Sequence, residues 1–198
     1  MFSFNENFFP SVLLLKIIYF DLVVEEMANY DLKIKFCSEN AKEIYENGAL
    51  LKYQTAGSSG FDIKAVDIYL PKTKETLVLG KDIEKYTLQP MERICVQVGF
   101  AIGGVPEGYE VQVRPRSGFA FKHGITIVNT PGTIDSDYRG EIGAILCNLS
   151  NEPFDITKGE RIAQMVVCPI VKCNICVVNE LDETERGTGR LGSTGTQN

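Results

Sequence analysis

The chain has 198 residues, which is enough for one domain with a substantial core and short for two. It contains 26 acidic and 20 basic residues, and the resulting net charge of −6 argues against binding along a nucleic-acid backbone. A small anionic ligand can still bind where arginines gather locally or a metal bridges the charge. Of the six cysteines, only Cys173 and Cys176 stand at C-x-x-C spacing, so the paired spacing of a zinc site is missing and we expect buried, reduced thiols.

Residues 1–30 are predicted to form an extension ahead of the domain, with Met27 as an alternative start for the folded core. The stretch 8–24 is apolar, but Lys16 and Asp21 interrupt it, and its length is at the short limit for a bilayer span. We therefore expect no stable membrane association. The flank lacks the positive charge of a secretory signal and the arginines of a mitochondrial presequence. Two roles of this stretch stay open: an extra strand or helix packed on the domain, and targeting to an organelle.

Residues 31–180 are predicted to form one β domain. Apolar and polar residues alternate in short runs, which Gly, Pro, Asn and Asp turn signals separate. Four of these runs are predicted to be strands: residues 32–36, 93–98, 109–114 and 142–147. Many short strands at regular spacing favour an all-β antiparallel sandwich or jelly roll over any βαβ architecture.

Other parts of the domain depart from this pattern. One short helix is predicted from Ser38 to about Tyr45, with Ser38 as its cap. Residues 71–89 mix lysines with acidic residues, as a solvated connection between strands does. Cys173 and Cys176 lie in a predicted strand, where an offset of three places them on opposite faces. The single histidine, His123, is predicted to be a loop or packing residue.

Two segments combine glycine with charge or hydroxyl groups in ways that a sandwich core does not require. Residues 56–62 carry glycines that allow a ligand close to the backbone, and their Asp62 can orient a metal-bound water. Arg116, Ser117 and Gly118 close a strand, and a hydroxyl beside an arginine at a tight turn is typical of a phosphate site. An ordinary turn is the alternative explanation for each.

The most specific internal signal lies in residues 129–141, which place two carboxylates and an aromatic in one predicted hairpin with Ile134 facing the core. A carboxylate fixed there, Asp135, can take a proton from water, and the ring of Tyr138 can lie flat on a sugar. The side-chain amide of Asn129 can read the donor and acceptor edge of a base. A further turn enters a strand at residues 158–165.

The glycine-rich tail, residues 186–195, contains the spacing of a dinucleotide fingerprint. That fingerprint requires a helix after it, and no chain remains to form one. Residues 181–198 are instead predicted to be a flexible arm whose arginines, hydroxyls and amide groups fold over a polyphosphate. A frayed tail without function is the alternative.

Taken together and in this order, these segments and the tail resemble the five motifs of the trimeric dUTPase family (dUTP diphosphatase), over about Asp31 to the C-terminus. The resemblance implies a jelly-roll homotrimer that shares three active sites among its subunits. It implies hydrolysis of dUTP to dUMP and pyrophosphate by water attack on the α-phosphorus, with Mg2+ on the triphosphate. This reaction limits uracil incorporation into DNA and supplies dUMP for dTMP synthesis. The implied compartment is the cytoplasm, the nucleus or both.

The resemblance also implies a role for each matching residue. Asp135 would activate the attacking water, and Tyr138 would stack under the deoxyribose and exclude a 2′-hydroxyl. Asp62 would act on the magnesium shell through water, because the triphosphate supplies the direct ligands. The remaining substrate contacts would come from Arg116, Ser117 and Gly118 at the phosphates, Asn129, Gly132, Thr133, Ile134 and Gly143 around the uracil, Gln164 at the phosphate chain, and Arg186, Leu191, Gly192, Ser193 and Thr194 in the arm.

Two departures and two rivals accompany the resemblance. Residues 71–89 are longer than the compact connection usual in the family, and we expect them to decorate the surface. Leu191 stands where the family's arm usually has a phenylalanine that stacks on uracil, so we expect weaker stacking and a lower Michaelis constant in Leu191→Phe. Within the same fold, a dCTP deaminase would release ammonia and need a glutamate base, for which Glu141 is available. The rival from another class is a binding protein without catalysis, which would not need Asp135 or the arm.

Overall fold

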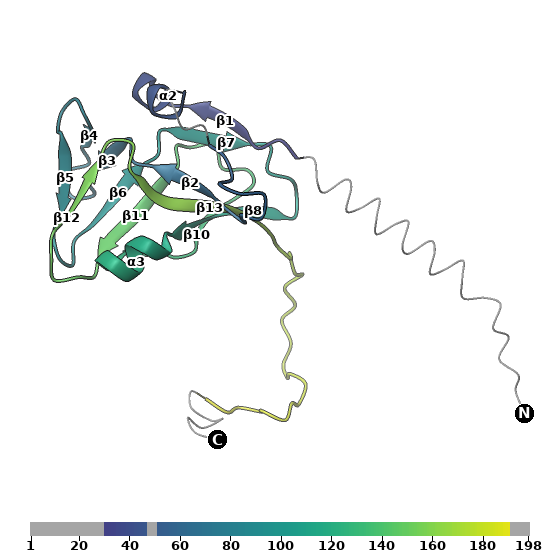
Figure 1. The fold of residues 1–198 in the computed structure, drawn as a ribbon. Helices are drawn as coiled ribbons and strands as arrows, with labels where there is room; N and C mark the ends of the chain where they lie inside the picture. Colours follow the sequence, from purple (N-terminus) through teal and green to yellow (C-terminus); the bar gives the residue numbers. More distant parts are fainter. Residues whose placement is uncertain (1–29, 47–50, 191–198) are drawn as a thin grey trace, which may run out of the picture.

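The computed structural model describes residues 30–46 and 51–190 (Figure 1). Most of the predicted N-terminal extension therefore lies outside the described residues. The elements, in chain order, are β1 (Lys33–Phe36), α2 (Glu39–Glu46), β2 (Phe61–Lys64), β3 (Asp67–Tyr69), β4 (Thr76–Val78), β5 (Lys85–Leu88), β6 (Arg93–Gln97), β7 (Phe100–Gly103), β8 (Tyr109–Pro115), α3 (Ser117–His123), β9 (Ile125–Ile127), β10 (Gly132–Ile134), β11 (Gly143–Asn148), β12 (Phe154–Thr157) and β13 (Arg161–Pro169). In the described part of the chain, no helix is long and apolar enough to cross a membrane.

Two antiparallel sheets form the body of the domain (Figure 1). One has the order β10-β8-β13-β2 and the other β4-β3-β6-β11-β9, and the pairs β1-β7 and β5-β12 complete the fold. Strands such as β8 alternate as predicted, because Val111 and Val113 are buried while Gln112 between them is half-buried. The mostly β architecture confirms the predicted all-β jelly-roll sandwich.

The predicted helix is present as α2, and Ser38 caps it. The Oγ atom of Ser38 accepts a hydrogen bond of 3.1 Å from the amide of Ala41, which satisfies one of the free amide groups of the first turn. Tyr45, at the other end, is 1% exposed and accepts a 3.0 Å hydrogen bond on its hydroxyl from the amide of Lys64. The helix is thereby fixed to the end of β2.

The prediction for residues 71–89 was right in part, because most of this segment is exposed, but it is more than a connection. It contains β4 and β5, and it inserts Leu79 and Leu88 into the core, both fully buried. These strands have only three and four residues, and charged or hydroxyl side chains occupy their outward positions, so the period-two signal is too short to recognise. Tyr86 at the middle of β5 donates a 2.6 Å hydrogen bond to Glu92.

Three further expectations fail in whole or in part. Ser117–His123 forms a helix, α3, where only a turn was expected, and Gly124 ends it with φ 66°. The residues around Cys173 and Cys176 form no strand, and both thiols are exposed. Of the six cysteines, Cys147 is buried and Cys95 and Cys168 are partly buried, so the expectation of buried thiols holds only in part, although all six are free. His123 packs against Phe154 at 5.1 Å between ring centroids, which fits its predicted packing role.

Candidate functional site

An ion-paired cluster lies where three neighbouring strands place polar side chains on one face. Asp62 on β2 lies opposite Gln164 on β13, and β13 in turn pairs with β8, which leads into Arg116. Oδ1 of Asp62 lies 3.2 Å from Nε of Arg116, and Oδ2 accepts a 3.0 Å hydrogen bond from Nη1 of Arg161. Asp62 is 17% exposed. The sheet register thus brings residues 45 or more positions apart in sequence into one cluster.

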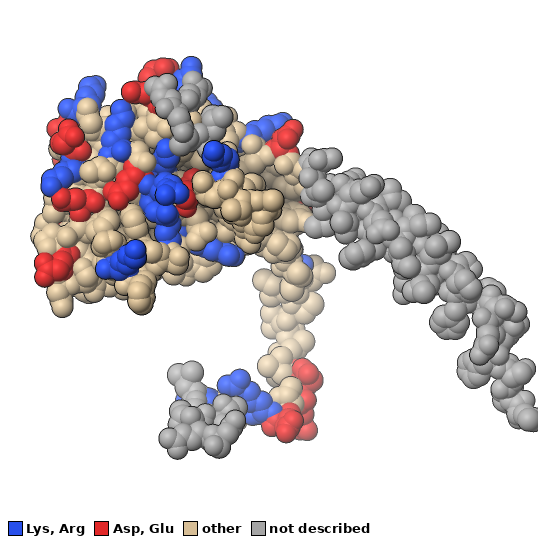
Figure 2. All heavy atoms as spheres, viewed as in Figure 1, with Lys and Arg blue, Asp and Glu red and all other residues tan. Residues whose placement is uncertain are grey.

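The two arginines of this cluster are held in place by more than the carboxylate. Nη1 of Arg116 donates a 2.8 Å hydrogen bond to the carbonyl of Arg161, and its guanidinium lies 5.4 Å from the ring centre of Phe119. With two guanidinium groups on a single carboxylate, the cluster keeps an excess positive charge. Burial lowers the pKa of the neighbouring Lys64, and the Arg161 cation lowers it further. Figure 2 shows basic side chains gathered over β2 and the start of β13.

Ser117 and Gly118 form the first turn of α3, directly after Arg116. Arg116 has the extended backbone of an N-cap residue, with φ −85° and ψ 131°, but makes no side-chain cap hydrogen bond. The first amide groups of a helix have no partner within the helix. A Cβ atom added to Gly118 would meet no atom within 4 Å, so the space beside this turn is open. An anion can therefore approach these amide groups beside Arg116.

Gln164 joins the same region. Its Nε2 donates a 3.0 Å hydrogen bond to the carbonyl of Pro115, the last residue of β8. Gly60, just before Asp62, is needed for close packing, because a Cβ there would lie 2.8 Å from the carbonyl oxygen of Met165. The structure thus brings together five of the predicted site residues: Asp62, Arg116, Ser117, Gly118 and Gln164.

Asp135 follows β10 and lies apart from the Asp62–Arg116 cluster. It is exposed and lines an open hollow of about 300 Å³ together with Glu110, Asp137 and Lys172. The predicted hairpin is wrong, because β10 pairs with β8 in one sheet whereas β11 pairs with β6 and β9 in the other. The segment between β10 and β11 crosses from one sheet to the other. It begins with a turn in which the amide of Tyr138 donates a 3.1 Å hydrogen bond to the carbonyl of Asp135.

Tyr138 is fixed by local contacts. The residue is 43% exposed, and its hydroxyl donates a 3.1 Å hydrogen bond to the carbonyl of Glu141. A Cβ atom at Gly140 would lie 2.3 Å from this hydroxyl, so only glycine permits the arrangement. An exposed aromatic face held by its hydroxyl can stack on a flat or puckered ring.

Asn129 and the glycines near it lie on the approach to β10 and at the start of β11. Nδ2 of Asn129 lies 3.3 Å from the position that a Cβ atom at Gly132 would take. Thr133 is exposed, and Ile134 is half-buried against the core, as predicted. A Cβ at Gly143 would lie 2.4 Å from Sγ of Cys95, so a side chain there would displace that thiol. Asn129 is exposed, whereas Gly132 is buried and Gly143 is partly buried.

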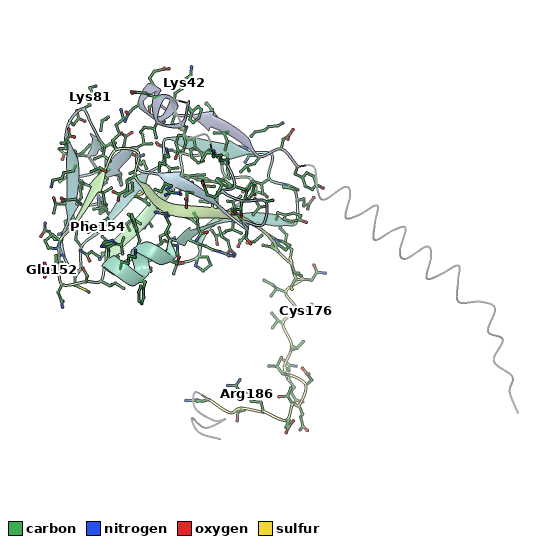
Figure 3. The ribbon with its side chains drawn as sticks, in the orientation of Figure 1. Lys42, Lys81, Glu152, Phe154, Cys176 and Arg186 are labelled. Carbon is green, nitrogen blue, oxygen red and sulfur yellow. The ribbon has the colours of Figure 1, made fainter. Side chains whose placement is uncertain are left out.

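The Asp62–Arg116 cluster and the residues around Asp135 lie at opposite ends of β8. Ile134 is opposite Val111, and Arg116 follows the far end of the same strand. Val111 and Arg116 are five residues apart along the strand, a distance of roughly 17 Å. A single chain therefore does not bring Asp135 to the Arg116 cluster. Of the arm, Arg186 is described and is exposed on the segment that extends away from the domain (Figure 3), whereas Leu191, Gly192, Ser193 and Thr194 lie outside the described residues.

Sequence reasoning missed two residues. Arg161 lies in the turn and strand predicted at residues 158–165 but was given no role, because its contact with Asp62 depends on strand register, for which the sequence carries no direct signal. Glu141 accepts hydrogen bonds from the amide of Gly99 at 3.0 Å and from Nε2 of Gln97 at 2.9 Å. It is a structural residue beneath the Tyr138 turn, and nothing in the local sequence indicates these partners.

Comparisons with known proteins point to the same family as the sequence motifs. The family model described as dUTPase matches residues 46–195. A deoxyuridine 5'-triphosphate nucleotidohydrolase from Nautilia profundicola is 48% identical over 154 residues, which are 78% of this chain and 96% of that protein. Its counterpart from Beijerinckia indica is 51% identical over 150 residues, 76% of this chain and 85% of that protein. Among solved structures, the Staphylococcus bacteriophage 80alpha dUTPase with dUPNHPP matches with a TM-score of 0.64 and 25% identity, covering 85% of this chain and all of that one. The chain belongs to the dUTPase family.

Proposed function

We propose that this chain hydrolyses dUTP to dUMP and pyrophosphate by water attack on the α-phosphorus. The observation that carries this proposal is the cluster of Asp62, Arg116 and Arg161 beside the open first turn of α3. Guanidinium groups and backbone amides are the donors that recognise phosphate oxygens, and here the sheet holds them in place before any ligand arrives. The solved relative that carries dUPNHPP supports a deoxyuridine triphosphate as the ligand.

On the phosphate side of the site, some residues would neutralise charge and others would orient the phosphates. Arg116 would neutralise charge that develops on the phosphate oxygens, while the hydroxyl of Ser117 and the amide groups of Ser117 and Gly118 donate to them. Gln164 would contact the phosphate chain, and its bond to Pro115 fixes the orientation of its amide. Because these donors are already fixed, they need little rearrangement during the reaction.

Asp135 would take a proton from the attacking water. Its carboxylate is exposed at an open hollow, which allows access of water and substrate. Tyr138 would stack under the deoxyribose and leave no room for a 2′-hydroxyl. Asn129, with the backbone around Gly132, Thr133, Ile134 and Gly143, would read the uracil edge. The arm, through Arg186 and residues 191–194, would close over the nucleotide and exclude bulk water.

Magnesium fits this site as an ion that arrives with the triphosphate. Both carboxylate oxygens of Asp62 contact guanidinium groups, and the described residues include no cluster of three or more side chains able to hold a metal. Asp62 suits a contact to the water shell of the ion rather than direct ligation. When bound, the ion would supply charge neutralisation on the phosphate oxygens.

We also propose that the active site is shared among the subunits of a homotrimer. The separation of roughly 17 Å along β8 keeps Asp135 away from Arg116 within one chain, too far for both to act on one α-phosphate. A second copy that presents its Asp135 to this cluster removes the difficulty. The exposed apolar side chains after β13, including Ile175 and Val177 at 95% and 97% exposure, also fit burial against another copy.

A dCTP deaminase, the rival within this fold, loses support. Its proposed base, Glu141, is occupied by hydrogen bonds to Gly99 and Gln97 and is half-buried beneath the Tyr138 turn. A carboxylate that is held in this way is not free to shuttle protons at a bound base.

The test is release of pyrophosphate from dUTP, with dTTP, dCTP and UTP alongside, with and without magnesium. We expect selective release from dUTP that magnesium stimulates. Release of ammonia from dCTP, or equal rates with UTP, would contradict the proposal. The compartment is expected to be the cytoplasm, the nucleus or both, which localisation of the full chain with and without residues 1–26 would test.

A further inference from the structure

Glu141 joins the Tyr138 turn to the connection between β6 and β7. One oxygen of its carboxylate accepts a 3.0 Å hydrogen bond from the amide of Gly99, and the other accepts a 2.9 Å hydrogen bond from Nε2 of Gln97. Its main-chain carbonyl accepts the 3.1 Å hydrogen bond that the hydroxyl of Tyr138 donates. All three bonds join described residues of one chain and need no second subunit. A single residue thus connects the Tyr138 hydroxyl to the body of the domain.

We propose that Glu141 is a positioning residue that sets the discrimination between deoxyribose and ribose. This role rests on the proposed function, in which Tyr138 stacks under the deoxyribose and leaves no room for a 2′-hydroxyl. Glu141 touches no substrate. It holds the carbonyl to which the Tyr138 hydroxyl is bound, and thereby the ring. A ring excludes one added hydroxyl only if it cannot move aside, so sugar discrimination depends on how firmly the ring is held.

The amide of Gly99 is a fixed donor for this carboxylate. Gly99 is buried and has φ 75°, and a Cβ atom there would lie 2.3 Å from Cβ of Ala41. Its carbonyl accepts a 2.8 Å hydrogen bond from the amide of Cys37. These contacts leave the residue little freedom to turn its amide toward another acceptor. Because a buried amide without a partner is costly, the Glu141 carboxylate is held at this place.

The backbone of Glu141 is anchored on one side only without this carboxylate. Ile142 is fully buried, its amide donates a 3.0 Å hydrogen bond to the carbonyl of Phe100, and its carbonyl accepts one of 3.0 Å from the amide of Val98. On the other side stands Gly140, which gives the chain more conformational freedom than any other residue would. The side chain of Glu141 therefore limits how far its own carbonyl, and the ring bound to it, can move.

Position 141 requires two acceptor atoms at the end of its side chain. Both carboxylate oxygens of Glu141 accept a hydrogen bond, whereas a methionine of similar length would offer an oxygen to neither donor. A glutamine would still serve, because its oxygen can accept from the Gly99 amide while its NH2 group donates to Gln97, whose own amide turns over. Loss of the two bonds and loss of the charge are therefore separable by two substitutions at one position.

The experiment measures kcat/KM for dUTP and for UTP in the full-length protein and takes their ratio, which a general loss of folded protein does not change. Glu141→Met should lower this ratio by about tenfold, because a small displacement of the ring admits the 2′-hydroxyl. Glu141→Gln should keep the wild-type ratio.

Glu92→Met is the matched control for Glu141→Met. Glu92 also accepts from one amide, that of Gln89 at 2.8 Å, and from one side chain, the hydroxyl of Tyr86 at 2.6 Å. It precedes β6, whereas Gln97 ends that strand, so its two bonds do not support the Tyr138 turn. Glu92→Met should leave the ratio of kcat/KM values unchanged.

Tyr138→Phe tests whether Glu141 acts through the tyrosine hydroxyl. Phenylalanine keeps the ring and loses the bond to the Glu141 carbonyl, so this variant should lower the ratio as well. Tyr138→Phe and Glu141→Met together should lower it no further than the larger single effect, because both release the same ring. If Glu141→Met does not fold, Gln97→Leu removes one donor, keeps the Gly99 bond and should lower the ratio by about threefold.

Four outcomes would overturn the inference: a wild-type ratio in Glu141→Met, an equal loss in Glu92→Met, an equal loss in Glu141→Gln, or effects of Glu141→Met and Tyr138→Phe that multiply. Where only Gln97→Leu folds, a wild-type ratio in that variant overturns it. Failure of the proposed function is distinguishable, because the wild type would then release no pyrophosphate from dUTP. NMR of protein with isotope-labelled tyrosine would still test the positioning. The ring signal of Tyr138, assigned by its absence in Tyr138→Phe, should shift in Glu141→Met and stay in place in Glu92→Met.

Discussion

The Asp62–Arg116 cluster and the Asp135 turn differ in how much of their final arrangement one chain supplies. The cluster is assembled by three paired strands, and each of its charged groups already has a partner. Asp135 is exposed at the edge of an open hollow, at the far end of the strand that leads to Arg116. The difference supports our proposal that one chain completes the phosphate-binding part of the site, and that a second chain supplies Asp135.

The largest effect is expected from Asp135→Asn. Removal of the base should lower kcat for dUTP by about 10²–10⁴-fold, because positioned general bases contribute rate enhancements of that size. Binding of a non-hydrolysable dUTP analogue should change little, since the phosphate cluster is intact. Pyrophosphate release and analogue titration measure the two effects. Asp137→Asn, a nearby carboxylate on the same turn, is the matched control and should retain nearly full kcat.

Mixed trimers would test directly whether the two regions come from different chains. Asp135→Asn and Arg116→Ala chains, each nearly inactive alone, are unfolded together, refolded and assayed. If each site takes Asp135 from one subunit and Arg116 from another, random assembly restores about a quarter of the wild-type activity. If both residues of a site came from one chain, every site would carry a substitution and no activity would return. Refolded wild type, treated identically, sets the reference value.

Asp62→Asn should weaken the cluster that a single chain already builds. The asparagine cannot pair with both guanidinium groups, and we expect the free energy of unfolding to fall by about 1–2 kcal/mol. Urea denaturation at a fixed protein concentration measures it. Asp155→Asn removes an exposed ion pair with Lys85 and should leave the midpoint unchanged. Equal losses in the two variants would mean that the cluster contributes no more than an ordinary surface pair.

The smallest expected effect is on pH dependence, through Glu141 beneath the Tyr138 turn. Burial raises the pKa of Glu141, the Gly99 amide partly offsets this, and the Asp67 carboxylate raises it further. The folded state therefore binds a proton more tightly than the unfolded state. The stabilisation from this proton is complete below the unfolded pKa and is lost as pH rises through the folded pKa.

Glu141→Gln removes this titration, so the stability of the wild type relative to the variant should decline as pH rises from about 4 toward neutrality. Denaturation curves at a series of pH values measure the difference. A relative stability that rose with pH would show that the Gly99 and Gln97 hydrogen bonds outweigh the cost of burial.

Much of the site could be predicted residue by residue, and its arrangement could not. Arg116, Ser117 and Asp135 stand out because glycine, hydroxyl and charged residues gather in turns where packing alone would not require them. The contact between Asp62 and Arg161 could not be found this way, because it joins residues 99 positions apart through the register of two strands. The helix α3 was missed because the glycine at its second position suggests a turn.

The sequence by itself determined the alternation of strands, the Ser38 helix cap and the order of motifs that places the chain in the dUTPase family, because these are local patterns of residue type. Only the tertiary structure decided that Leu79 and Leu88 pack into the core, that the Tyr138 turn crosses between sheets, and that Asp135 and Arg116 lie at opposite ends of β8. The physical reason is that strand pairing joins distant parts of the chain, and each pairing is selected by which faces can be buried together.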